Sequence, residues 1–373
     1  MTQGVAEAFI LLRLCIYPGV AGDFGTISAD LTGPLNAVGV TSTTGRLSTA
    51  CSAISADLTG QIALLARGTC SFSTKIRNAQ NAHAIRVVMV NNAFGDPIAM
   101  GQDGTGNQPT IPAYMVSKTD GAALESAIVT TPGNATIGVT QQYFVTGNDG
   151  IMASFSSQGP TNDFRVKPDV VAPGVNVLSS IPTSFCGDTA HGCFAFFQGT
   201  SMATPHLAGS AAIVKWEHPS WTSDQIRSAI VNTARSSFLK PSTGIGLDQN
   251  PLHVGAGFED LNNAVHASVG LDPVSSSFGA VPSGSSQSRS ATITLSNLTG
   301  SSESLTLAAG TGGTGVTFGV SPSSVTIPAG GSTTVTVSMT ESAAVSPGSH
   351  FTYLTISSGG TQVAHAALYT FVK

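Results

Sequence analysis

One serine stands where a hydrolytic nucleophile would be expected. Ser201 lies in the string GTSMATPH (residues 199–206), in which small residues form a turn and an apolar helix follows. A hydroxyl at a helix N-terminus is held at a fixed point, and the backbone N–H groups of the same turn, aided by the helix dipole, can stabilise an oxyanion. The small neighbours leave room for a peptide carbonyl. A lone Gly-Thr-Ser is also an ordinary helix cap, so accompanying motifs must decide.

Three further segments accompany this serine. The string GTSMATPH resembles the nucleophile motif of the subtilisin-like serine peptidases (subtilases). Residues 153–160 (ASFSSQGP) and 167–174 (KPDVVAPG) are similar to that family's ASFSSRGP and KPDVVAPG segments, in the same order and spacing. Residues 254–257 (VGAG) are similar to the glycine turn before the last helix of the family's domain. The resemblance implies that Ser201 is the catalytic nucleophile and that its own backbone N–H is an oxyanion donor.

The base and the acid that such a serine needs are not found in the chain. The family takes them from H-G-T-H and D-[ST]-G segments, and neither string occurs in the sequence. We therefore expect the chain to be a C-terminal fragment that is inactive alone. His206, five residues after Ser201 on one helix, cannot turn its ring back onto the hydroxyl and is interpreted as a packing or helix-surface residue. His191 is nearer to the site, where a position at the rim is favoured over a role as base.

Two other polar residues invite a catalytic interpretation. Asn148, in residues 147–150 (GNDG), resembles the family's AGN-x-G segment that supplies an oxyanion donor, but it lies only a few residues before Ala153. A turn built on Asn-Asp-Gly is the simpler interpretation, with the oxyanion role kept open. Asp169 lies in the KPDVVAPG segment, where the resemblance implies a structural loop and not the triad acid.

The elements around the serine follow from hydrophobic periodicity. Residues 201–216 form an Ala- and Gly-rich helix with almost no charge, which predicts burial on most faces. Thr222 followed by Gln225 is a capping box that opens a second, amphipathic helix. Trp216 and Trp221, which bracket the end of one helix and the start of the next, are expected in the core.

The chain before this region has a pattern of alternating strands and helices. Residues 36–130 alternate apolar strands, at 61–66 and 86–90, with a helix from Phe72, and predict a small α/β domain. Residues 60–72 and 75–79 resemble a protease-associated domain, in which His83 stands where Gly is usual and is expected to adopt a left-handed conformation.

After residue 271 only short alternating strands occur. These strands, at 292–295, 325–327, 333–339 and 351–356, predict a fibronectin-III-like or immunoglobulin-like β-sandwich. The expected fold is thus multidomain, α/β plus β. Its divisions are a remnant of the front peptidase half at 1–35, a protease-associated domain at 36–135, the serine-bearing peptidase half at 136–270 and the sandwich at 271–373.

The composition argues against nucleic acid and membranes as partners. The 373 residues carry 15 basic and 20 acidic side chains, 9% of the chain, with a net charge of −5 and no Lys/Arg run. No nucleic-acid partner and no polybasic membrane patch is therefore expected. The longest apolar run near the N-terminus, residues 8–12, is far shorter than the roughly 20 residues that span a bilayer, so no membrane span is expected.

The cysteines indicate an oxidising compartment. Cys51 with Cys70 and Cys186 with Cys193 form two local pairs that we expect to be disulfides, with Cys15 left over. The alternative is five free thiols in a cytosolic protein.

The sequence thus predicts a secreted serine endopeptidase of the subtilisin type. It would hydrolyse protein or peptide substrates through an acyl-enzyme on Ser201, with no catalytic metal and no cofactor. Calcium sites occur in many relatives, but no ligand cluster stands out in this chain. The alternative function is a non-catalytic extracellular binding protein with a degenerate peptidase half.

Overall fold

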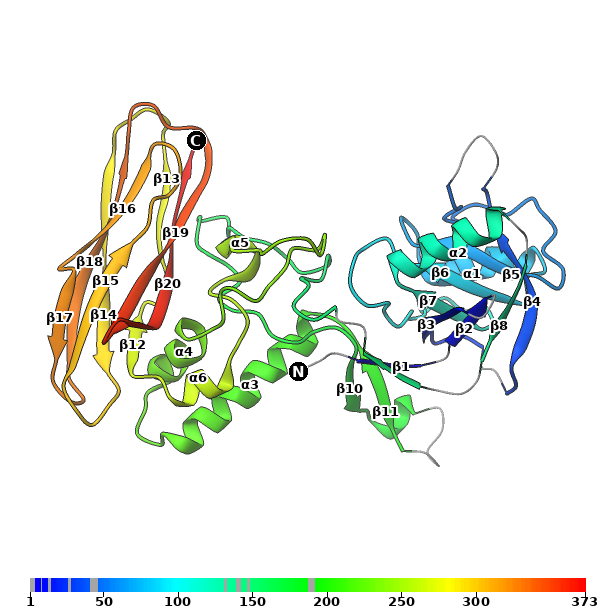
Figure 1. Cartoon of the computed structure of the whole chain (residues 1–373), viewed down its shortest axis with the longest axis horizontal. Coiled ribbons are helices and arrows are strands. Elements are labelled where there is room, and N and C mark those ends of the chain that lie inside the picture. The colour runs from blue at the N-terminus through cyan, green and yellow to red at the C-terminus, as the bar shows by residue number, and fades with distance from the viewer. Residues whose placement is uncertain are drawn as a thin grey trace. The chain divides into compact units, whose positions relative to one another are not determined.

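The structure is a computed structural model. It describes residues 4–7, 9–12, 15–25, 28–40, 46–130, 133–138, 142–145, 148–186 and 192–373. These form two compact units, the first from residues 1–154, 174–198 and 242–244, and the second from residues 155–173, 199–241 and 245–373 (Figure 1). His191, the candidate at the rim of the site, lies outside the described residues.

The first unit is organised around a closed barrel of seven strands. Its central strands β4, β5, β6 and β7 are neighbours in parallel, and β2, β3 and β8 close the barrel in antiparallel pairing. In barrel order the strands are β2 (Phe9–Leu12), β3 (Cys15–Ala21), β7 (Ala113–Val116), β6 (Arg86–Val90), β5 (Ile62–Ala66), β4 (Leu31–Ala37) and β8 (Asn134–Ile137).

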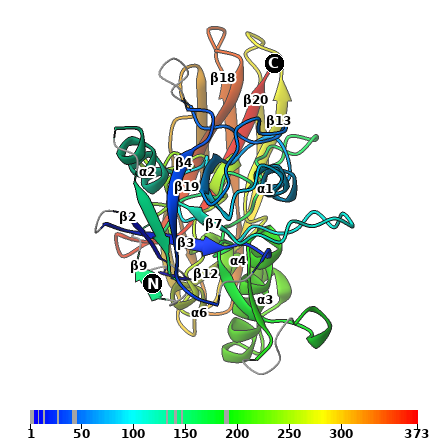
Figure 2. The same ribbon diagram turned by 90° about the vertical axis from the view of Figure 1, so that its right-hand side faces the viewer.

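Two helices pack on opposite faces of these strands. Successive side chains of a strand point to opposite faces, so Ile62 and Leu64 of β5 enter one core and Ala63 and Leu65 enter another. The first core also contains apolar residues of α2 (Lys118–Thr130), and the second those of α1 (Phe72–Asn81). Figure 2 shows the two helices flanking the barrel. His83, just after α1, has a φ of 69°, which confirms its left-handed conformation.

The expected boundaries of this region are wrong. The boundary after residue 35 falls inside β4, the one after residue 135 inside β8, and β2 and β3 are barrel strands and not a separate remnant. The physical reason is that β8 pairs with both β2 and β4, and β3 pairs with β7, so strands β2, β3 and β4 are held by partners about one hundred residues later.

Two strand pairs complete the first unit. The strands of each pair are antiparallel. Gly199 of the serine motif lies two residues after the end of the second pair. The pairs are β1 (Gly4–Glu7) with β9 (Gln142–Val145), and β10 (Val177–Ser180) with β11 (Phe194–Phe197), with the 3-10 helix η1 (Thr183–Phe185) between the latter two.

The second unit contains four helices among the described residues, and the first of them carries the serine motif. The Thr222 hydroxyl accepts a hydrogen bond from the Gln225 backbone N–H, and the Gln225 side chain accepts one from the Thr222 N–H, which confirms the predicted capping box. The helices are α3 (Thr200–Glu217), α4 (Ser223–Asn232), α5 (Pro251–Val254) and α6 (Leu261–Val265).

Two sheets pack face to face in the rest of the second unit. Their inner side chains form one apolar core, as the alternating pattern predicts. One sheet has the order β12 (Val269–Asp272), β14 (Ser288–Asn297), β18 (Ser332–Glu341), β16 (Val316–Ser321). The other has the order β13 (Ser276–Val281), β20 (Thr361–Val372), β19 (Gly348–Ser358), β15 (Glu303–Ala309), β17 (Ser324–Ile327). The expected boundary after residue 270 divides β12 and is therefore wrong by a few residues.

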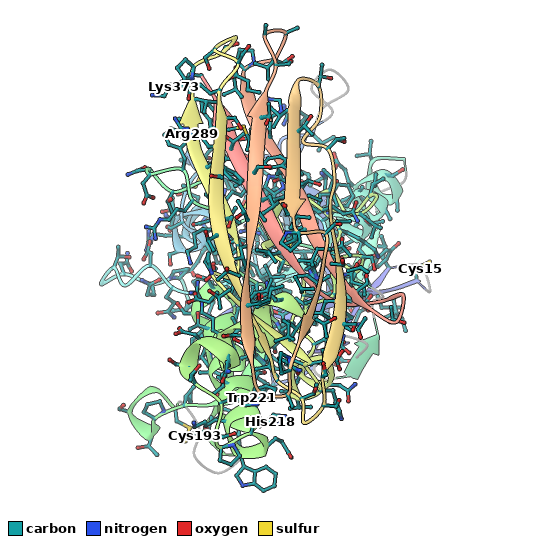
Figure 3. All side chains as sticks on the ribbon, turned by 90° about the vertical axis from the view of Figure 1, so that its left-hand side faces the viewer. Cys15, Cys193, His218, Trp221, Arg289 and Lys373 are labelled. Carbon is teal, nitrogen blue, oxygen red and sulfur yellow. A yellow bond between two sulfur atoms is a disulfide. The ribbon has the colours of Figure 1, made fainter. Side chains whose placement is uncertain are left out.

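Helix α3 is far more exposed than its composition predicts. Only Ser210 and Val214 are buried, while Ile213 is 45% and Trp216 is 76% exposed. The predictions of a buried helix and of a core Trp216 are therefore wrong. Trp221 is in the core as expected, with its ring stacked at 3.8 Å on that of His218 (Figure 3). The described residues thus leave Ile213 and Trp216 of α3 exposed.

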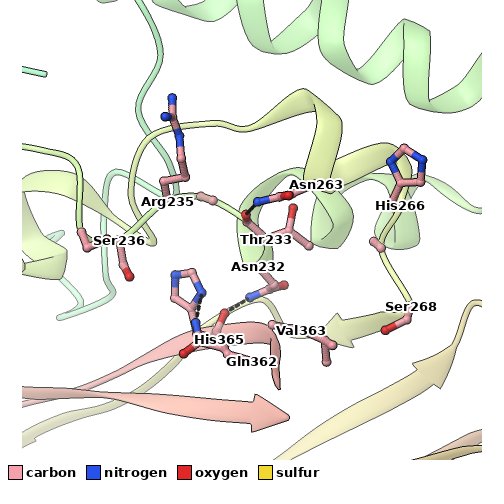
Figure 4. A pocket seen from close by; sticks show the side chains of 14 residues that line it. Asn232, Thr233, Arg235, Ser236, Asn263, His266, Ser268, Gln362, Val363 and His365 are labelled. Atoms are coloured by element: carbon pink, nitrogen blue, oxygen red, sulfur yellow. Dashed lines mark hydrogen bonds between the residues drawn. The ribbon is translucent and has the colours of Figure 1, made fainter. Parts of the chain in front are cut away.

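Buried polar contacts join the helices to the sandwich. The fully buried Asn232, at the end of α4, donates from Nδ2 to the carbonyls of Val274 and His365, both at 2.8 Å. Figure 4 draws the bond to His365. His365 Nε2 bonds the carbonyl of Ala256 at 2.6 Å. The Tyr353 hydroxyl donates to Gly255 O, also at 2.6 Å. The sandwich is thus anchored to the VGAG turn at residues 254–257.

We expect the His365 contact to be sensitive to acid. Burial lowers the pKa of His365 below its ordinary value, and its bond to the backbone of Ala256 only partly opposes this. Because the unfolded chain takes up a proton near pH 6.5 while the folded one does not, stability is full above about pH 6.5 and falls as the pH drops through the lower folded pKa. The nearby Tyr353 does not titrate in this range, and burial and Asp248 raise its pKa further.

The measurement is thermal unfolding at pH 7 and pH 5 of the unaltered chain, His365→Gln and His266→Gln. His266 is an exposed histidine of the same unit and serves as the matched control. The acid-induced fall in Tm should shrink in His365→Gln and persist in His266→Gln, at about 2–4 °C for every kcal/mol involved. An unchanged fall in His365→Gln would contradict this assignment.

Candidate active site

Ser201 is placed at the first turn of α3 by the glycine before it. Gly199 is the N-cap residue with φ 148°, a conformation that side-chain-bearing residues rarely adopt. Its carbonyl accepts hydrogen bonds from the N–H groups of Met202 (3.0 Å) and Ala203 (3.3 Å), which starts the helix. Ser201 itself is exposed, and neither its N–H nor its hydroxyl bonds to any described residue. A free hydroxyl and a free amide on one residue are the parts needed to attack a carbonyl and hold its oxygen.

The side chains that follow Ser201 on α3 stabilise the helix and do not activate the serine. The Thr204 hydroxyl donates to the carbonyl of Thr200 at 2.9 Å, and His206 Nδ1 bonds the carbonyl of Met202 at 2.9 Å. Pro205 lies between them inside the helix and has no N–H to donate to the carbonyl of Ser201, four residues before it. His206 is thus engaged with its own helix, as the sequence indicates.

No described histidine is bonded to Ser201. His253 comes closest in type to a catalytic base, because its Nδ1 lies 3.0 Å from Oδ2 of the buried Asp248, but its Nε2 faces Asn250 at 3.3 Å. The remaining described histidines each contact a group of their own. The contacts are His83 with Asp57, His218 with Val265 O, His266 with Asn262 O, His350 with Gly312 O and Ser346 O, and His365 with Ala256 O.

Asn148 lies in the first unit, where its Nδ2 donates to Asp96 Oδ1 at 2.8 Å. It is followed by a turn at 149–150 in which Gly150 has φ 73°, consistent with Asn-Asp-Gly turn chemistry. Its role as an oxyanion donor stays a prediction.

Asp169 has the structural surroundings expected of its motif. Its Oδ2 accepts hydrogen bonds from Lys167 Nζ at 2.8 Å and Arg227 Nη2 at 3.0 Å. Burial alone would raise the pKa of Asp169, but the hydrogen bonds and charges of these two cations outweigh burial and lower it. Its carbonyl accepts from the N–H of Ala256 at 2.9 Å. Asp169 therefore holds a loop in place and is not free to orient a catalytic histidine.

The KPDVVAPG and VGAG segments are bonded to each other along their backbones. The N–H of Val171 donates to Gly257 O, and that of Glu259 donates to Val171 O, both at 2.9 Å. Gly255 has φ 59°, and a Cβ there would collide with the backbone of Asp169. Two of the motifs that accompany Ser201 thus form one structural element.

Both local cysteine pairs are disulfides in the structure. They join Cys51 to Cys70 and Cys186 to Cys193, and leave Cys15 as an exposed free thiol.

An apolar pocket of about 610 Å³ lies beside α3. Leu207 and Ala211 of α3, Ile226 and Ile230 of α4 and residues 167–170 line it, while Ser201 does not. A more polar pocket of about 350 Å³, drawn in Figure 4, lies beside Asn232 and His365. In the described part of the chain, no group of three or more His, Cys, Asp or Glu side chains could hold a metal ion. Within the same part, no helix is both long and apolar enough to cross a membrane.

A family comparison defines the class of protein. A family model described as the subtilase family (Peptidase S8) matches residues 53–257, more than half of the chain, and the chain therefore belongs to the subtilases.

This chain is similar to several known proteases over part of their length. The minor extracellular protease Vpr of Bacillus subtilis is 36% identical over 73% of this chain and 32% of its own. The subtilisin-like protease SBT1.7 of Arabidopsis thaliana is 30% identical over 53% of this chain and 27% of its own. The C5a peptidase of Streptococcus pyogenes serotype M3 is 30% identical over 57% of this chain and 17% of its own. The chain thus spans a third or less of the length of these relatives.

Proposed function

We propose that this chain is part of a serine endopeptidase of the subtilisin type, and that Ser201 is its nucleophile. The observation that carries the proposal is the exposed Ser201 at the start of α3, with its N–H and hydroxyl unbonded among the described residues. Membership of the subtilase family supports the same role.

The reaction would be amide hydrolysis in two halves. Ser201 Oγ attacks the carbonyl carbon of a peptide bond while a base takes the hydroxyl proton, and the Ser201 N–H holds the developing oxyanion. The amine leaves with that proton, and an acyl-enzyme on Ser201 remains. Water then attacks the ester and releases the second product. Gly199 fixes where the hydroxyl stands, because its positive φ sets the turn into α3.

We infer that the base and the acid come from a polypeptide segment outside this chain. Two observations support this inference. The sequence contains neither H-G-T-H nor D-[ST]-G, and no described histidine is bonded to Ser201. Helix α3 also exposes Ile213 and Trp216, although the apolar side chains of a helix are normally covered. A segment that packs on α3 would cover these side chains and could bring a base to the serine.

We also propose an identity for two domains and a location for the protein. We propose that the barrel is a protease-associated domain, that the sandwich is a fibronectin-III-like domain and that the protein is secreted. Two disulfides and a relative named as an extracellular protease support secretion. The substrates would be proteins or peptides.

The experiment joins this chain to an upstream subtilase segment that carries both motifs and measures casein hydrolysis. Ser201→Ala should abolish hydrolysis, and Ser237→Ala, a change at an exposed serine of the same unit, should leave it intact. Equal activity of the Ser201→Ala form and the unaltered form would exclude Ser201 as the nucleophile.

A further inference from the structure

Lys75 is a buried lysine that the proposed peptidase chemistry does not use. It lies in α1 with its side chain fully buried, and its Nζ donates to the carbonyl of Thr49 at 2.6 Å. Burial lowers the pKa of Lys75 to about 8. None of the ion pairs among the described residues includes it, so its ammonium has no anion beside it. A buried charge without a counterion is costly, and this one lies next to a disulfide.

The two sulfurs of that disulfide have different surroundings. Lys75 Nζ lies 3.4 Å from Cys51 Sγ, and the Thr69 hydroxyl lies 3.1 Å from the same sulfur. No comparable donor contacts Cys70 Sγ within the described ranges. A nearby cation and a hydroxyl donor are the features that stabilise a thiolate. Cys70 has only the weaker influence of a position one residue before Ser71, the N-cap of α1.

We propose that Cys70 is a thiol-modification site, at which a low-molecular-weight thiol forms a mixed disulfide while Cys51 leaves as a thiolate beside Lys75. The external thiolate attacks Cys70 Sγ, and a new S–S bond forms there. The Cys51–Cys70 bond breaks, and its electron pair stays on Cys51 Sγ. One disulfide replaces another, so the step needs no oxidant and no reductant other than the attacking thiol.

The sulfur that leaves more readily determines which cysteine carries the mixed disulfide. Thiol–disulfide exchange is faster when the departing thiol has a lower pKa, and the ammonium of Lys75 favours the anionic form of Cys51. The departing thiolate also gives the buried ammonium the counterion that it lacks. The proposal stands apart from the peptidase function, because no step of it involves Ser201.

The experiment treats the whole chain with glutathione, blocks free thiols with iodoacetamide and maps the modified peptides by mass spectrometry. Glutathione should be found on Cys70 and carbamidomethyl on Cys51, with a preference of about tenfold. The Cys186–Cys193 pair in the same molecule provides a reference for reagent accessibility. Glutathione on Cys51, or equally on both cysteines, would overturn the proposal.

Variants test the part played by the lysine. Lys75→Met should slow exchange at Cys51–Cys70 about tenfold and remove the preference for Cys70, while Lys118→Met, at an exposed lysine of α2, should change neither. Thr69→Val removes the second donor from an exposed position and should cause a smaller loss of preference, about threefold. This variant and the mapping on the unaltered chain decide the matter if Lys75→Met does not fold. An unchanged preference in folded Lys75→Met would overturn the proposal.

Discussion

Casein hydrolysis by the 373-residue chain alone should be about 10⁶-fold slower than hydrolysis by the same chain joined to a segment that supplies the acid and the base. Without a base, the Ser201 hydroxyl stays protonated at neutral pH and is a poor nucleophile. The magnitude is that of removing triad residues from subtilisin, a member of this family, and is borrowed from it. The free amide at Ser201 can still hold an oxyanion, but it cannot remove the proton.

The matched comparison is Ser201→Ala in both forms. In the chain alone the substitution should change nothing, because there is no serine-dependent rate to lose. In the joined form it should return hydrolysis to the level of the chain alone. Hydrolysis by the chain alone that disappears in Ser201→Ala would mean that a base exists within it, and His191 would be the first residue to replace.

Asn232→Ala should cause the largest loss of stability in the second unit. The side chain is fully buried, donates to Val274 O and His365 O, and accepts from the Ser228 hydroxyl at 2.8 Å. Removing it leaves two carbonyls and a hydroxyl without this partner, at a cost of about 2–4 kcal/mol. For a domain of this size the Tm should fall by about 5–15 °C.

Asn262→Ala is the matched control, because that asparagine is exposed on α6. Its replacement should change the free energy of unfolding by no more than about 0.5 kcal/mol. Asn232→Asp keeps the shape but removes both donors, and should destabilise as Asn232→Ala does. Calorimetry on the three variants measures the effect. An Asn232→Ala protein with the same Tm as the unaltered chain would show that the packing of α4 on the sandwich does not depend on this side chain.

Local signals in the sequence predicted local structure well. The capping box at Thr222 and the strand at residues 86–90 were recognisable because their determinants lie within a few residues of each other. The Cys51–Cys70 pair is of the same kind, since only nineteen positions separate its members.

Features that depend on distant partners were not predictable in this way. Strand β8 is only four residues long, and it becomes a barrel strand because it pairs with β2 and β4, about one hundred residues earlier in the chain. The composition of α3 predicts a buried helix, but burial depends on what covers it, and Trp216 stays exposed among the described residues. The burial of Lys75 also depends on the approach of Thr49 and Cys51, which lie more than twenty residues before it in the chain.

The most direct test of the account is to locate the adduct of a fluorophosphonate probe by peptide mass spectrometry. The probe reacts with a serine only when a base activates it. We predict one adduct per molecule at Ser201 when the chain is joined to a segment carrying the acid and base motifs, and none in the chain alone. Stoichiometric labelling of Ser201 in the chain alone, or an adduct at a different serine in the joined protein, would contradict the account.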